Sequence, residues 1–116
     1  MLDTILPAGL IRALGVFNMV EIECRKVKFY SLQDEASFFS WAQSITAVSN
    51  IIGQGSSIII RIKTKPISDN SLRKLLALFQ RYNIPMADLA QFRNTHNELW
   101  FASPVAYWYK SVFGDT

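Results

Sequence analysis

Two hydrophobic periods alternate along this chain, and their order restricts the fold more than any other feature of the sequence. Between residues 20 and 25, and again between 60 and 63, apolar and polar residues alternate, which is typical of half-buried β-strands. Elsewhere apolar residues recur every three or four positions, which is the spacing of one buried helix face. Strands and helices mixed in this order, with no internal repeat, predict an α+β domain.

The first predicted strand begins at Met19. Its alternation would place Val20, Ile22 and Cys24 on one side and Glu21, Glu23 and Arg25 on the other. After Lys26 the phase reverses, because Val27 and Phe29 are apolar. A one-residue change of phase moves side chains to the opposite face of a sheet. We therefore expect the strand to continue through a β-bulge near Arg25 and Lys26.

A hairpin is predicted in the middle of the chain. Residues 48–52 and 58–64 are β-rich runs on either side of the loop 53–57, and Pro66 ends the second run. In the second run Ile58, Ile60 and Ile62 share one face. The glycine-containing loop has no lysine and precedes a strand, so it does not fit a phosphate-binding loop.

Helix signals lie on both sides of this hairpin. Ser31 and Asp34 form a capping-box pattern at the start of a helix predicted over residues 31–46. Ser68 begins a second predicted helix, which ends at Asn83 and Pro85. The buried stripes would be Phe38, Trp41, Ala42 and Ile45 in the first helix, and Leu72, Leu75, Leu76 and Phe79 in the second, with Tyr82 as a further candidate.

The C-terminal third predicts two further helices. Pro85 would start a short helix that carries Met86, Leu89, Ala90 and Phe92 inward. Ser103 and Pro104 are typical of a helix start, and Gly114 of a helix end. Between these ends Val105, Trp108, Tyr109 and Val112 recur at the spacing of one helix face.

A small three-stranded, mainly antiparallel sheet with three to four helices packed on one face satisfies this order. Residues 19–116 would form this single α+β domain. Residues 1–18 are apolar with little charge, and two interpretations stay open for them. They are either an N-terminal extension with a short helix from Pro7, or a segment upstream of a natural start at Met19.

Composition indicates in which cellular compartment the protein is expected. No apolar run approaches the roughly 20 residues that span a bilayer, and Met1 is not followed by a positively charged signal-peptide region. Cys24 is the only cysteine, so no internal disulfide can form. We therefore expect a cytoplasmic protein without membrane contact.

The sequence shows no catalytic or metal-binding constellation, so we expect no enzyme and no cofactor. His96 is the only histidine, and a nucleophilic pair would have to join it to Cys24 or a serine across the fold. One histidine and one cysteine also leave too few ligands for a structural zinc ion.

Function is therefore expected at the surface. The net charge is +3, and Arg61 and Lys63 share one strand face that Arg25 or Lys28 would extend. This basic face fits either an ordinary solvated sheet surface or single-stranded nucleic acid. The C-terminal third is rich in aromatic residues, of which Trp100, Tyr107 and Tyr109 are candidates for exposed anchors of a protein interface.

Residues 72–92, reading LRKLLALFQRYNIPMADLAQF, and residues 100–114 resemble a set of small uncharacterised bacterial proteins. Those proteins occur near polymorphic toxin genes, such as Rhs or contact-dependent inhibition systems, and resemble immunity proteins. The resemblance covers roughly residues 19–114 and carries no catalytic motif. It implies a protein-interaction module that neutralises a toxin domain by stoichiometric binding. The alternative function is a basic nucleic-acid-binding accessory protein.

Overall fold

The computed structural model describes residues 19–63 and 66–114. Both interpretations of residues 1–18 fall outside this range. The described elements are β1 (Met19–Arg25), α2 (Leu32–Ser44), β2 (Val48–Gln54), β3 (Ser57–Lys63), α3 (Asp69–Arg81), the 3-10 helix η2 (Ala87–Phe92), α4 (Glu98–Phe101) and α5 (Tyr109–Phe113).

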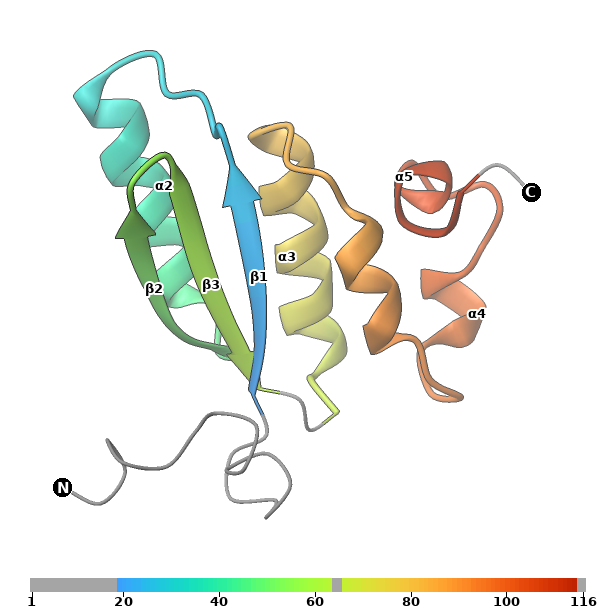
Figure 1. Ribbon diagram of the computed structural model, residues 1–116. Coiled ribbons are helices and arrows are strands. Elements are labelled where there is room, and N and C mark those ends of the chain that lie inside the picture. Colours follow the sequence, from blue (N-terminus) through green and yellow to red (C-terminus); the bar gives the residue numbers. More distant parts are fainter. Residues whose placement is uncertain (1–18, 64–65, 115–116) are drawn as a thin grey trace, which may run out of the picture.

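The three strands form one antiparallel sheet in the order β1-β3-β2. Figure 1 shows α2 and α3 together behind this sheet, with η2, α4 and α5 placed further out on the α3 side. The α+β prediction is confirmed. β1 and β2 lie on either side of β3, and α2 connects them. This connection, followed by β3 and α3, is that of a split βαβ arrangement.

β3 is the central strand, and its alternation decides which face of the sheet is covered. Ile58, Ile60 and Ile62 are buried, as the sequence pattern predicted, together with Ile22 and Cys24 of β1. The intervening side chains point to the opposite, open face. The helix stripes complete the core with Phe38, Ala42, Ile45, Leu72, Leu75, Leu76 and Phe79, and Leu78 is buried as well.

The predicted bulge in β1 is wrong. β1 pairs with β3 without a register shift from Met19 to Arg25, and the strand then ends. The phase changes because Lys26 takes a positive φ of 56°, which turns the chain out of the sheet. Val27 and Phe29 then pack against the core from a non-strand segment. The irregularity lies instead in β2, between Val48 and Asn50.

The hairpin between β2 and β3 is tighter than the sequence predicted. β2 extends to Gln54 and β3 begins at Ser57, which leaves a two-residue turn. Gly55 begins this turn with a φ of +62°, a backbone conformation that glycine adopts without steric penalty.

Side-chain caps fix the starts of both long helices. The Ser31 hydroxyl accepts a hydrogen bond from the Asp34 amide at 3.0 Å, and the Asp34 carboxylate in turn accepts from the Tyr30 amide at 3.0 Å. The Ser68 hydroxyl likewise accepts from the Ser71 amide at 3.1 Å. The Ser71 hydroxyl then accepts from the Ala47 amide at 3.2 Å, which ties the start of α3 to the segment that leads into β2.

The end of α3 is a Schellman motif. The Ile84 amide donates to the Phe79 carbonyl at 2.9 Å and the Asn83 amide to the Gln80 carbonyl at 3.3 Å. Asn83 takes the left-handed conformation that this motif requires, with a φ of 57°. Ile84 is buried, so the chain leaves the helix in a fixed direction towards η2.

The C-terminal prediction is partly wrong. The segment from Pro85 forms the 3-10 helix η2 and buries Met86, Leu89 and Phe92 as expected. The long last helix from Ser103 does not form: a helix begins only at Tyr109, after turns, and an unpredicted short helix, α4, precedes these turns. Val105, which fits the helical spacing, is exposed.

Among the helices that the structure describes, none is long and apolar enough to cross a membrane.

Asn83 offers a test of the Schellman motif. Asn83→Ala should lower the free energy of unfolding by about 1 kcal/mol, because a Cβ-bearing residue without a local hydrogen-bonding side chain is disfavoured at positive φ. Asn83→Gly should leave stability unchanged or raise it slightly. Urea unfolding followed by circular dichroism measures both, and equal stabilities of the two variants would contradict the assigned backbone conformation.

Candidate binding surfaces

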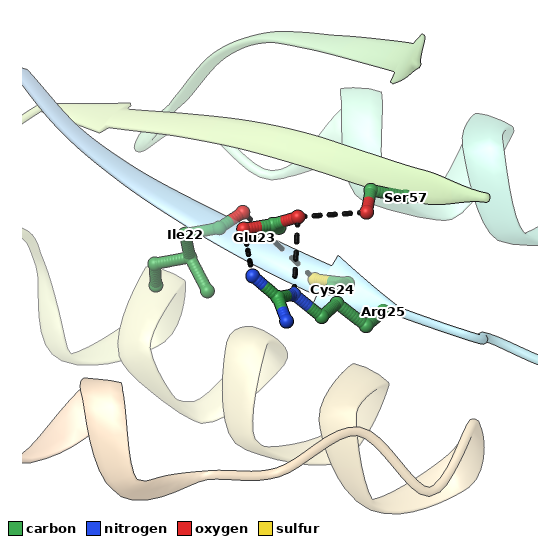
Figure 2. Close-up of polar contacts among 5 residues, drawn as sticks. All are labelled: Ile22, Glu23, Cys24, Arg25 and Ser57. Atoms are coloured by element: carbon green, nitrogen blue, oxygen red, sulfur yellow. Dashed lines mark hydrogen bonds and ion pairs between the residues drawn. The ribbon is translucent and has the colours of Figure 1, made fainter. Parts of the chain in front are cut away.

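The open face of the sheet carries paired charges. Arg61 Nε lies 2.8 Å from Glu21 Oε2, and these residues are directly opposite each other on β3 and β1. On β1 itself, Arg25 Nε lies 3.2 Å from Glu23 Oε2. The Glu23 carboxylate also accepts a 2.7 Å hydrogen bond from the Ser57 hydroxyl. Figure 2 shows Glu23 between these two partners, Arg25 and Ser57.

These contacts favour the ionised form of Glu23. The hydrogen bond from Ser57 and then that from Arg25 lower the pKa of the Glu23 carboxyl. The predicted basic residue Arg25 therefore stands beside a carboxylate that stays negative at neutral pH, and Arg61 is paired with Glu21. Lys63 lies on the same face, opposite Met19. This face presents alternating charges rather than a continuous basic stripe.

Lys28 is not on the sheet. It lies in the segment after β1 and lines a hollow with residues from the end of α3. The seven candidate surface residues named from the sequence thus fall into three separate regions of the fold. Arg25, Arg61 and Lys63 are on the open sheet face, Lys28 is beside α3, and Trp100, Tyr107 and Tyr109 belong to the C-terminal segment.

Cys24 is fully buried on the covered side of β1, and His96 is exposed in the connection before α4. Burial, and then the negative charges of Asp88 and Glu23, raise the pKa of the Cys24 thiol to about 12. A thiol of this kind stays protonated at neutral pH, whereas the thiolate is the reactive nucleophile. Within residues 19–63 and 66–114, no group of three or more His, Cys, Asp or Glu residues is placed to hold a metal ion.

The C-terminal segment is built around Trp108. Its indole N–H donates to the Phe101 carbonyl at 2.7 Å, which joins the start of α5 to the end of α4. Its ring meets Trp100 edge-on at 5.9 Å and Tyr107 at 4.8 Å between centroids. Such edge-to-face pairs add to the energy of burial and fix the relative orientation of the rings.

Trp100 and Tyr109 are less available than the sequence suggested. Both are half-buried. The Arg73 guanidinium covers the Trp100 ring at 3.9 Å from its centroid, and Tyr109 packs against Phe113 at 5.4 Å. The Trp100 indole N–H is buried without a partner among the described residues. Tyr107 alone of the three is largely exposed, at 58%.

Two exposed apolar residues in this segment were missed. Leu99 is 92% exposed and Val105 is 91% exposed, although Leu99 belongs to an apolar triplet and Val105 fits a helical stripe. Sequence periodicity assigns such residues to the core, because it assumes one continuous helix. With Tyr107, we call them the C-terminal apolar residues.

Comparisons with protein-family models, with curated proteins and with solved structures find no match to this chain.

The burial of Cys24 predicts an inert thiol. A disulfide reagent at pH 8 should label Cys24 only after the domain is unfolded in denaturant. The raised pKa also predicts that its contribution to stability is complete below pH 9 and is lost as the pH rises towards 12, since the unfolded chain ionises first. Stoichiometric labelling of the native protein within minutes would contradict the burial of this strand face.

The Trp108 hydrogen bond predicts a measurable cost when it is removed. Trp108→Phe keeps a ring but leaves the Phe101 carbonyl without its donor, so the free energy of unfolding should fall by about 1–3 kcal/mol. Tyr107→Phe is the matched control, because it removes a hydroxyl from an exposed neighbouring ring. Equal unfolding midpoints for the two variants would show that the indole bond does not hold this segment.

Proposed function

We propose that this chain is a non-enzymatic protein-interaction module that binds its partner through the C-terminal apolar residues. The observation that carries the proposal is the exposure of Leu99, Val105 and Tyr107 within one short segment, residues 98–108. Large apolar and aromatic side chains at the surface are the usual anchors of protein interfaces. Leu99 and Val105 contribute almost no burial to the folding of this chain, and Tyr107 contributes only part of its ring surface, against Trp108.

The rigidity of the segment supports this choice. Asn97, only 2% exposed, donates from its amide to the Phe92 carbonyl at 2.8 Å and accepts from the Asn94 amide at 2.9 Å. At the other end, Trp108 fastens the segment to Phe101. A surface that is already ordered loses little conformational entropy on binding, so more of the contact energy appears as affinity.

The size of the expected contribution is moderate. Complete burial of a leucine or valine side chain is worth roughly 1.5–3 kcal/mol, and micromolar affinity corresponds to about 8 kcal/mol. The C-terminal apolar residues therefore supply a substantial part of a binding energy, and polar contacts around them would supply the rest. Partner recognition on this scale needs no catalytic group.

For the partner, we propose the toxin domain of a polymorphic toxin system, with this chain acting as its immunity protein in the cytoplasm. The support is the resemblance of residues 72–92 and 100–114, which include most of the rigid segment and Val105 and Tyr107. The lone, unpaired Cys24 suits a reducing compartment. Neutralisation would be stoichiometric, by covering the toxin's active site or its substrate groove.

Nucleic-acid binding on the open sheet face is the weaker alternative. Phosphates approaching Arg61 and Arg25 would meet the carboxylates of Glu21 and Glu23, which already occupy these cations. Repulsion from the same carboxylates would oppose the electrostatic attraction on which nonspecific nucleic-acid binding depends.

Co-expression tests the partner. The chain should co-purify with the toxin domain encoded beside its gene, with submicromolar affinity by isothermal titration calorimetry, and should abolish that domain's toxicity. Absence of binding to the neighbouring toxin domain would reject the immunity proposal.

Paired surface variants test the contact residues. The double variant Leu99→Ser and Val105→Ser should keep the unfolding midpoint and weaken partner binding at least about 30-fold, equivalent to about 2 kcal/mol. Leu32→Ser is the matched control, since Leu32 is 85% exposed at the start of α2, outside the segment. Loss of binding in the control, or full binding in the double variant, would place the interface elsewhere.

A further inference from the structure

The arginine side chains of the described chain divide into engaged and unengaged groups. Arg25, Arg61 and Arg93 each form an ion pair with a glutamate, and Arg73 lies on Trp100. Arg81 forms no ion pair with any residue of the described ranges, and the same holds for Lys26 and Lys28. Lys26, Lys28 and Arg81, none of which is in an ion pair within the described ranges, lie around one place.

That place is a hollow between the segment after β1, the first turn of α2 and the end of α3. Its lining residues are Lys26, Lys28, Tyr30, Asp34, Arg81, Tyr82 and Asn83. Asp34 is the only acidic residue among them, so the lining carries three positive charges and one negative charge at neutral pH. The carboxylate of Asp34 is already engaged by the Tyr30 amide.

The backbone around the hollow is unusual as well as ordered. Lys26 and Asn83 both line it, and they are the non-glycine residues of the described chain that adopt a positive φ. Lysine in this conformation costs roughly 1–2 kcal/mol, because its Cβ crowds the following carbonyl. Strain of this kind is often retained where it directs a side chain needed for function.

Two tyrosines form the remaining walls, and they differ in how tightly their rings are packed. Tyr82 is held by edge-on contacts to Phe38 at 4.9 Å and Phe29 at 6.0 Å. Burial and then the charge of Asp34 raise the pKa of the Tyr82 hydroxyl, which therefore stays a hydrogen-bond donor at neutral pH. Tyr30, in contrast, is 84% exposed, and the Lys28 ammonium lies 6.0 Å from its ring centroid.

We propose that this hollow binds a nucleotide, with its phosphates among Lys26, Lys28 and Arg81 and its base stacked on Tyr30. A ligand with two or more negative charges matches the excess positive charge of the lining. Arg and Lys side chains are the usual phosphate partners, and an exposed aromatic ring accepts any base without sequence preference. This site is separate from the C-terminal apolar residues and does not depend on the proposed partner.

The same chemistry has two sources, a free nucleotide and a unit of a single-stranded oligonucleotide. A free nucleotide would bind with its terminal phosphates inside the hollow, and pyrophosphate would compete with it. An oligonucleotide would add phosphate contacts outside the hollow, and its affinity would fall with salt at a slope of roughly 0.7 per neutralised phosphate.

Binding of adenosine triphosphate, of pyrophosphate and of a short single-stranded oligonucleotide to the full chain tests this proposal by isothermal titration calorimetry. We expect saturable binding with one nucleotide per chain. Arg81→Gln and Lys28→Gln should each weaken it about tenfold, the effect of losing one charge-assisted hydrogen bond. Lys26→Asn removes the third charge while keeping a residue that tolerates positive φ, and should act similarly.

Lys74→Gln is the matched control, because it removes one positive charge from the exposed side of the same helix as Arg81 without touching the hollow. It should bind like the unmodified chain. Tyr30→Ala should weaken the nucleotide but not pyrophosphate. If Lys74→Gln weakens binding as much as Arg81→Gln does, net charge alone explains the effect and the proposed site is wrong. Failure of all three ligands to bind would also overturn the site. Equal weakening of pyrophosphate by Tyr30→Ala would overturn the stacking role.

Discussion

The alternate isoleucines of β3 are the constraint on which the rest of the structure depends. β3 pairs with both other strands, so its register fixes the register of the whole sheet. A one-residue slip would bury Arg61 and expose Ile60 and Ile62, and the core of the described residues holds no carboxylate that could pair with the buried guanidinium. The helices follow from this choice, since the leucine stripe of α3 must cover the face that the isoleucines present.

The same alternation decides how charge is distributed. Because Glu21 and Arg61 are opposite each other in register, and Glu23 pairs with Arg25, the two arginines of the open sheet face are held in ion pairs. Three cations that form no ion pair with the described residues lie where the chain leaves the sheet, at Lys26 and Lys28, and where α3 ends, at Arg81. The two proposed sites differ in physical character: the C-terminal apolar residues offer burial, and the hollow offers charge.

Local sequence rules were most successful where one short-range interaction decides the structure. Ser31 and Ser68 cap their helices because a hydroxyl reaches an amide three residues on. The local sequence rules failed where a single backbone angle or a distant contact decides the structure. The phase change after β1 reads as a bulge, yet it results from the positive φ of Lys26. Val105 matches a helical stripe, but the Trp108 indole donates back to the Phe101 carbonyl, and turns stand where that helix was predicted.

The sequence by itself determined the α+β class, the buried and open faces of β1 and β3, and the ends of α2 and α3 within a few residues. Each of these depends on periodicity or on contacts within one turn. Only the tertiary structure decided which arginines are paired, which aromatic residues remain exposed, and that Lys26, Lys28 and Arg81 line one hollow. Those outcomes depend on strand register and on contacts between residues far apart in the chain, for which local patterns carry no signal.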